Sequence, residues 1–129
     1  NILFNLVEMD FVTSQWADCV GRIEGLLPDM DPSDLTMIRL LEFKYLLCKL
    51  KLGNTDEART LAKKYDFRDD YPYYYYANAA LAYHDENEAE AERWRASARR
   101  VFRRPSTLAA WEDTMIEIGF VKSFYGGVK

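Results

Sequence analysis

The sequence predicts an all-α fold, in the form of an α-solenoid of antiparallel helical hairpins with about seven helices. Two segments 33 residues apart share one helical pattern, and a looser copy lies 41 residues before the first of them. No run of alternating apolar and polar residues is long enough to indicate a strand. A two-helix repeat of this length is typical of a solenoid, because one hairpin cannot bury its apolar face alone.

The repeated segments place small and bulky residues at helical spacing and close at a proline. The aligned residues are Glu57, Ala58, Leu61, Tyr65 and Pro72 in one copy and Glu90, Ala91, Trp94, Ala98 and Pro105 in the next. Ala17 and Val20 repeat the spacing in the looser copy. We expect hairpins at about 2–28, 33–66 and 72–104 and a capping helix at about 107–119, with Leu61 and Trp94 in the interior.

Start and stop signals divide the chain into seven helices, at about 3–10, 15–27, 32–52, 56–65, 73–84, 88–103 and 108–118. Pro28 stops the second helix, and Gly53 closes the third in the position of a C-terminal glycine cap. Thr55 caps the fourth helix, and Pro72 opens the fifth. Pro105 follows the sixth, and a glycine follows the seventh.

The third helix is apolar on two faces, which predicts a position between other helices. One face carries Ile38, Leu41, Tyr45, Cys48 and Leu52, and the other carries Leu40, Phe43, Leu47 and Leu50. The fourth helix has one apolar stripe, formed by Ala58, Leu61, Ala62 and Tyr65. We therefore expect long helices inside the layer and shorter helices outside it.

Length and charge limit the possible classes of protein. A chain of 129 residues, 49% of them apolar, forms one core, so we interpret 1–129 as a single domain. The net charge of −4 is too small to predict a nucleic-acid or membrane-surface partner. No stretch approaches the roughly 18 apolar residues that span a bilayer. Because the chain begins at Asn1 inside an apolar run, we interpret it as a fragment of a longer protein.

The residues from Gly53 to Arg59, with Leu61, Ala62 and Tyr65, resemble the turn and second helix of a tetratricopeptide repeat (TPR). The resemblance continues through Tyr76, Ala79, Ala80, Tyr83, Trp94, Ala98 and Pro105. It covers about 34–105, although Asn87 replaces the usual turn glycine. The resemblance implies a TPR-like superhelix that acts as a non-catalytic scaffold for a peptide or protein partner, with no cofactor and no metal.

The resemblance also implies a concave groove, lined by the first helices of the second and third hairpins. The expected groove residues are Phe43, Lys44, Leu47, Leu50, Tyr74, Asn78 and Leu81. This set is too apolar for the carboxylate-gripping variant of the family, so the expected ligand is an apolar or aromatic segment. Two alternatives stay open. The tyrosines at 73–76 could pack between hairpins instead of lining the groove, and the apolar floor of the groove could be covered by the chain's own tail or by a second copy.

Six arginines between Arg93 and Arg104 form the main local concentration of basic residues. Acidic residues precede them on the same helix, which is the arrangement that the helix dipole favours. The alternative is an RNA-binding or anion-binding surface. Trp94 counts against nucleic acid, because it falls on the buried stripe and not among the exposed arginines. A further alternative is an accessory domain of a larger enzyme.

No group of residues predicts catalysis or metal binding, because the chain has no nucleophile with a base, no Gly-rich phosphate loop and no metal-ligand spacing. His84 stands alone at a helix end. The acidic loop at 29–34 lacks the glycine and glutamate of a calcium loop. Cys19 and Cys48 are expected as buried reduced thiols, which favours the cytoplasm, with a disulfide as the alternative.

Both ends of the predicted α-solenoid carry apolar residues that must be buried against another part of the chain or a partner. These are Leu3, Phe4, Leu6 and Val7 in the opening helix and Phe120, Phe124 and Tyr125 in the tail. We expect the tail to fold back on the last hairpin. The opening helix is expected to meet either upstream chain or a second copy, which makes a homo-oligomer possible.

Overall fold

The computed structural model describes residues 2–122, and these residues form helices and no strands. The elements are α1 (Ile2–Val12), α2 (Trp16–Leu26), the 3₁₀ turn η1 (Leu27–Asp29), α3 (Leu35–Lys51), α4 (Thr55–Ala62), α5 (Tyr73–His84), α6 (Glu88–Val101) and α7 (Pro105–Glu117). The prediction of an all-α protein is confirmed. Within the described residues, no helix is both long enough and apolar enough to cross a membrane.

The expected helix bounds are closest to the observed ones where the local signals are strongest. α5 has the bounds expected from Pro72 and the following turn. α3 begins three residues later than expected, because the Asp31 carboxylate accepts hydrogen bonds from the backbone N–H and the hydroxyl of Ser33 and holds a turn there. α4 ends early, at Ala62, where the Lys63 N–H bonds to the Thr60 carbonyl in a tightened last turn.

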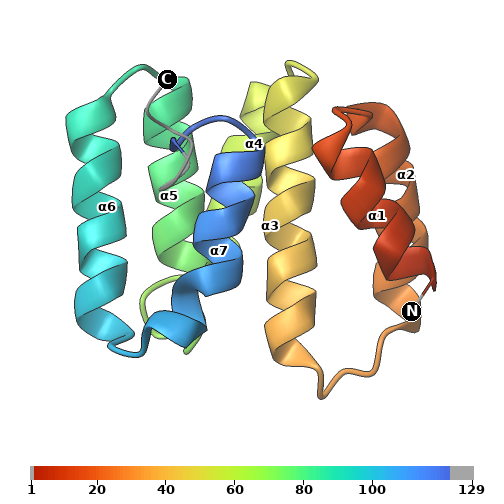
Figure 1. The fold of residues 1–129 in the computed structure, drawn as a ribbon, viewed down its shortest axis with the longest axis horizontal. Helices are drawn as coiled ribbons and strands as arrows, with labels where there is room; N and C mark the ends of the chain where they lie inside the picture. The colour runs from red at the N-terminus through yellow and green to blue at the C-terminus, as the bar shows by residue number, and fades with distance from the viewer. Residues whose placement is uncertain (1, 123–129) are drawn as a thin grey trace.

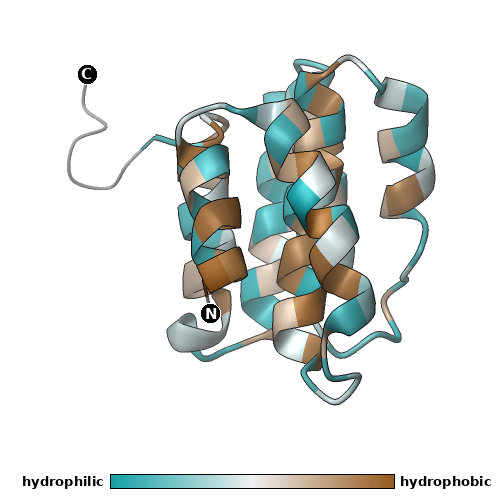
Figure 2. Ribbon diagram, turned by 90° about the vertical axis from the view of Figure 1, so that its right-hand side faces the viewer, coloured by the Kyte–Doolittle hydropathy of each residue, from teal (hydrophilic) through white to brown (hydrophobic). Residues whose placement is uncertain are grey.

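The helices pack as three antiparallel pairs, α1 with α2, α3 with α4 and α5 with α6 (Figure 1). α3 and α5 lie in the centre, between α6 on one side and α1 and α2 on the other (Figure 1). α7 returns across the molecule and contacts both α3 and α6. In the perpendicular view of Figure 2, the short α4 stands at one edge, and apolar residues run through the helices between the two edges.

The core is centred on α3, as its two apolar faces predict. Its buried residues include Leu40, Leu41, Phe43, Leu46, Leu47, Cys48 and Leu50. The Phe43 ring packs against Tyr73, Tyr76 and Trp111, with ring centres 6.5, 6.3 and 5.1 Å away. Leu52 departs from the prediction, because it lies beyond the last turn of α3 and is exposed.

Arg39 of α3 pairs with the connection between α4 and α5. Arg39 donates two hydrogen bonds to the Asp69 carboxylate, at 3.0 and 2.8 Å. Its guanidinium also lies 3.8 Å from the centre of the Tyr65 ring. This bidentate ion pair fixes the ten residues between the two helices against the start of α3.

The two ends of the described chain are partly covered. In α1, Val7 and Phe11 are fully buried, whereas Ile2, Met9 and Val12 remain exposed. At the other end, the Phe120 ring stacks on Tyr83 with a centre-to-centre distance of 5.5 Å, so the chain after α7 does fold back on the last pair. Phe124 and Tyr125 lie outside the described residues.

We expect the stability of the fold to fall as the pH rises from 10 towards 12. Burial and hydrogen bonds to Glu42 and Glu92 raise the pKa of Tyr65 and Tyr83 to about 12, from an ordinary value of 10.0. Burial also raises the pKa of Tyr45, Tyr73 and Tyr76. The unfolded state therefore loses these protons first, and the stability present below pH 10 is lost as the pH rises through about 12.

Tyrosinate absorbance and denaturant unfolding, followed together against pH, test this expectation. We expect a first group of tyrosines to ionise near pH 10 and a second group to ionise only with unfolding. Ionisation of all nine tyrosines in one step, with the helical signal unchanged, would contradict the described burial.

Candidate functional site

The structure closes the expected groove between α3 and α5. Phe43 and Leu47 are fully buried and Leu50 nearly so, and none of the three offers a surface to a ligand. α7 provides the cover, because Trp111 packs on Phe43 and on Tyr76 at 5.1 and 5.9 Å. The expectation of an open apolar floor from α3 is therefore corrected, because α7, the helix expected as a cap, lies over these residues.

Lys44 is also not a groove residue, because its side chain is 2% exposed. Its ammonium lies 3.3 Å from Glu8 of α1 and 3.5 Å from Glu117 of α7, and it lies 4.4 Å from the centre of the Phe11 ring. Burial, together with the nearby Glu8, raises the pKa of Glu117, while Lys44 opposes that rise. Lys44 thus joins three helices through ion pairs.

The three expected groove residues of α5 are half-buried, and Tyr74 packs against α6. Tyr74 is half-buried against α6, where its ring lies 5.2 Å from Trp94. Asn78 uses its amide to donate to the Tyr74 carbonyl, and Leu81 is half-buried beside the core. The α5 residues that pack against Phe43 of α3 are Tyr73 and Tyr76. The expected groove residues of α5 therefore do not line one groove together with those of α3.

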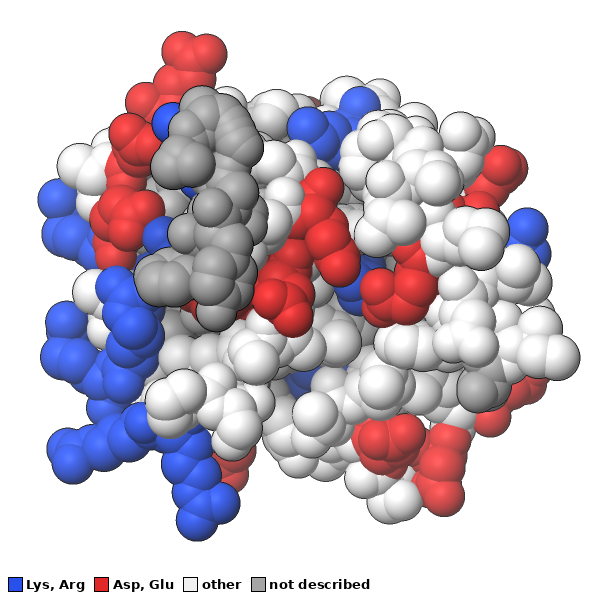
Figure 3. Space-filling view, viewed as in Figure 1, with Lys and Arg blue, Asp and Glu red and all other residues white. Residues whose placement is uncertain are grey.

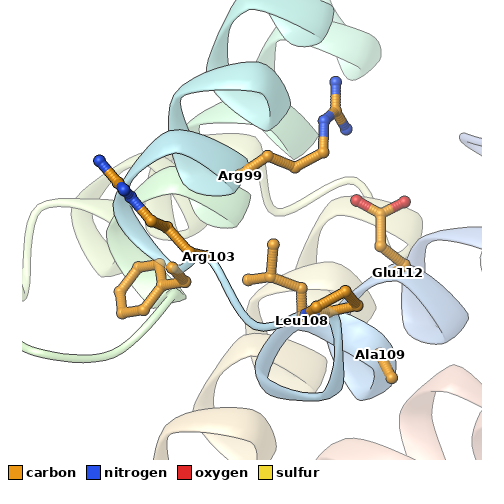
Figure 4. A pocket seen from close by; sticks show the side chains of 7 residues that line it. Arg99, Arg103, Leu108, Ala109 and Glu112 are labelled. Carbon is orange, nitrogen blue, oxygen red and sulfur yellow. The ribbon is translucent and has the colours of Figure 1, made fainter.

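A different hollow, which we call the arginine pocket, opens between the end of α6 and the start of α7 (Figure 4). Its volume is about 240 Å³. It is lined by Arg99, Phe102, Arg103, Pro105, Leu108, Ala109 and Glu112. Figure 4 shows Leu108 pointing into the hollow, with Arg99 extending on the side of Glu112 and Arg103 on the opposite side.

The arginines around this pocket differ from the others on α6 in their partners. Arg93 pairs with Glu90, and Arg95 pairs with Glu92 and Glu112. Within residues 2–122, in contrast, Arg99, Arg100, Arg103 and Arg104 form no ion pair with a carboxylate, and all four are exposed. In Figure 3 basic side chains gather at the lower left of the molecule, where α6 ends.

Glu112, the acidic residue of the wall, is already engaged. It accepts two hydrogen bonds from Arg95, at 2.6 and 3.2 Å, and another from the Tyr76 hydroxyl. Burial alone would raise the pKa of Glu112, but these hydrogen bonds, with the nearby charges of Arg95 and Arg99, outweigh it and lower the pKa below its usual value. The Glu112 charge is therefore balanced inside the fold, which leaves the arginine pocket with a positive rim.

An apolar floor with a positive rim suits a ligand that combines an apolar side chain with negative charge. The sequence indicated the arginines but not the pocket. The floor forms because Pro105 starts α7 directly after α6, which brings Phe102 near Leu108. The signal that could have located it is the sequence around the end of α6, where Arg99, Phe102 and Arg103 come just before Pro105.

Comparison of the chain with protein-family models, with curated proteins and with solved structures gave no match.

Proposed function

We propose that this chain is a non-catalytic, TPR-like interaction module that binds an acidic protein segment in the arginine pocket. The observation that carries the proposal is the combination of an apolar hollow and four exposed arginines without acidic partners in the described residues. The α-solenoid part of the proposal is supported by the three antiparallel helix pairs and by α7, which packs across α3 and α6 as a covering helix.

An acidic segment with an apolar side chain fits this pocket better than RNA. Single-stranded RNA is bound largely by stacking bases on exposed aromatic rings. The two aromatic residues near the arginines are already used, since Phe102 packs on Tyr75 at 6.0 Å and Trp94 packs on Tyr74. The floor, in contrast, has room for an aliphatic or aromatic side chain.

We expect the protein to bind a labelled peptide in which Asp and Glu alternate with Leu and Phe, measured by fluorescence anisotropy. Reversing two rim charges, Arg99→Glu with Arg103→Glu, should weaken binding by about tenfold or more, because attraction becomes repulsion at the rim. Ala109→Asp should weaken it as well, by adding negative charge to the wall. Arg93→Gln is the matched control, because Arg93 lies on the same helix but already pairs with Glu90.

Two further probes separate the alternatives. A peptide with the same charge but Ser in place of Leu and Phe should bind more weakly, since it cannot fill the floor. An oligouridine that binds as tightly as the acidic peptide, and loses binding with the same Arg99 and Arg103 changes, would favour the RNA-binding function instead. Equal binding of the acidic peptide by the parent protein and the charge-reversed variant would overturn the proposal.

A further inference from the structure

Charge is distributed unevenly along the chain. Residues 2–34 contain seven acidic residues and one basic residue, Arg22. Residues 99–104 contain four arginines and no acidic residue. The net charge of −4 therefore conceals an acidic N-terminal part and a basic segment at the end of α6.

These two segments lie towards opposite ends of the molecule. Figure 1 has the longest axis horizontal, with α6 at the left and α1 and α2 at the right. Figure 3 shows basic side chains at the lower left, and acidic side chains at the lower right near the connection between α2 and α3. The two surfaces therefore do not meet within one copy but are both open to a neighbour.

Several carboxylates of the acidic part have no basic partner. Glu8 and Asp10 pair with Lys44 and Arg22. Among the described residues, the exposed acids without an ion pair include Asp18, Asp29, Asp31 and Asp34. Hydrogen bonds from Ser33 lower the pKa of Asp31 and keep it ionised. Three of these acids lie in one connection, at 29–34.

The same connection carries apolar residues between its acids. Met30 is half-buried, and Pro28 and Pro32 are exposed on either side of it. The exposed part of this segment, with Pro28 and Pro32 beside its acids, has the chemistry that the arginine pocket requires, namely negative charge beside apolar surface. The chain thus contains both a pocket with a positive rim and a segment suited to it.

We infer that the α2–α3 connection of one copy docks in the arginine pocket of a second copy, so that the protein associates head to tail. This inference rests on the proposed function, and it identifies the acidic segment that the pocket binds as the α2–α3 connection of a second copy. Charge complementarity supports a second copy as the occupant, because the exposed acids of 29–34 and the exposed arginines of 99–104 carry opposite charges and form no ion pairs among the described residues. Such a contact joins two different surfaces, so it can repeat into open chains.

Sedimentation velocity over a range of protein concentrations tests the inference. At low salt the average mass should rise above the 15.1 kDa of one chain as concentration increases, and it should return to that value at high salt, because exposed charges are screened. Two variants remove the contact from either side: Arg99→Glu with Arg103→Glu, and Asp29→Lys with Asp34→Lys. Asp31 is left in place because it holds the turn through Ser33.

Each variant alone should stay monomeric, and an equimolar mixture of the two should associate again. In the mixture, the native connection of the first variant meets the native pocket of the second. A misfolded variant could not show this recovery, and Arg93→Gln should associate as the parent does.

A parent protein that stays monomeric at low salt would overturn the inference. Unchanged association of both variants would also overturn it, and would place the contact elsewhere. Binding of the synthetic acidic peptide by a monomeric parent would still support the proposed function, so the two failures are distinguishable.

Discussion

Replacing Trp111 with Ala is expected to lower the free energy of unfolding by about 4 kcal/mol. Trp111 is 2% exposed and packs against Phe43 and Tyr76 in the centre of the core. Its removal leaves a large cavity between α3, α5 and α7, which rigid helices fill only in part. Urea unfolding followed by the helical circular dichroism signal measures the loss.

Trp94→Ala is the matched control, because it truncates the same side chain at a half-buried site. Trp94 was expected in the interior from its place in the repeat, but its ring lies at the edge of the core, against Tyr74 and Tyr75. Its truncation should cost about 2 kcal/mol. Equal losses for the two variants would show that α7 is not packed on α3 as described.

The order of helices could be predicted because their boundaries depend on local signals. Pro72, Asn87 and Pro105 all stand next to observed helix starts, and the Asn87 side chain accepts a hydrogen bond from the Glu90 N–H as an N-cap does. The ends of α3 and α4 were harder to locate, because a turn at Asp31 and a tightened turn at Lys63 are not visible in apolar spacing.

The groove could not be predicted, because an apolar face does not identify what covers it. Phe43 and Leu47 have the same pattern whether a partner or another part of the chain lies on them. The covering helix has its own signal, since Leu108, Trp111 and Met115 recur at helical spacing and are all buried. The length and apolar spacing of α7 could therefore be predicted from the sequence. Which face of α3 it packs against depends on tertiary contacts that the spacing does not show.

Lys44 shows a second limit of sequence interpretation. A lysine within an apolar helix predicts either a site or an exposed position, and periodicity cannot distinguish them. The structure buries its ammonium because Glu8 and Glu117, from helices more than a hundred residues apart in sequence, both reach it. Pairing across such a distance depends on the packing of α1 and α7 against α3.

The arginines of α6 fit both of the interpretations that the sequence left open. Arg93 and Arg95 pair with acids of the same helix or of α7, as a structural role requires. Arg99 and Arg103 instead stand at the rim of a pocket without an acidic partner in the described part of the chain. The paired arginines thus lie earlier in α6, and the arginines without a paired acid among the described residues lie at its end and in the residues that follow it.

Replacing Glu112 with Ala is expected to lower the free energy of unfolding by about 3 kcal/mol. The change leaves the Arg95 guanidinium, whose side chain is 12% exposed, without its main partner, and it removes the acceptor of the Tyr76 hydroxyl. A largely buried guanidinium that keeps only the half-exposed Glu92 as its counter-charge costs more than the lost hydrogen bonds alone. The partial exposure of Glu112 places the cost at the low end of the range for broken buried pairs.

Glu92→Ala is the control for this variant, because Glu92 also pairs with Arg95 but its side chain is 50% exposed. Water can replace that partner, so the loss should stay below about 1 kcal/mol. Changing both members of the inner pair, with Arg95→Met and Glu112→Leu, should recover part of the stability that Glu112→Ala loses, because the only charge then left without its partner is the half-exposed Glu92. Equal losses for Glu92→Ala and Glu112→Ala in urea unfolding would show that the Arg95 and Glu112 pair is no more buried than a surface ion pair.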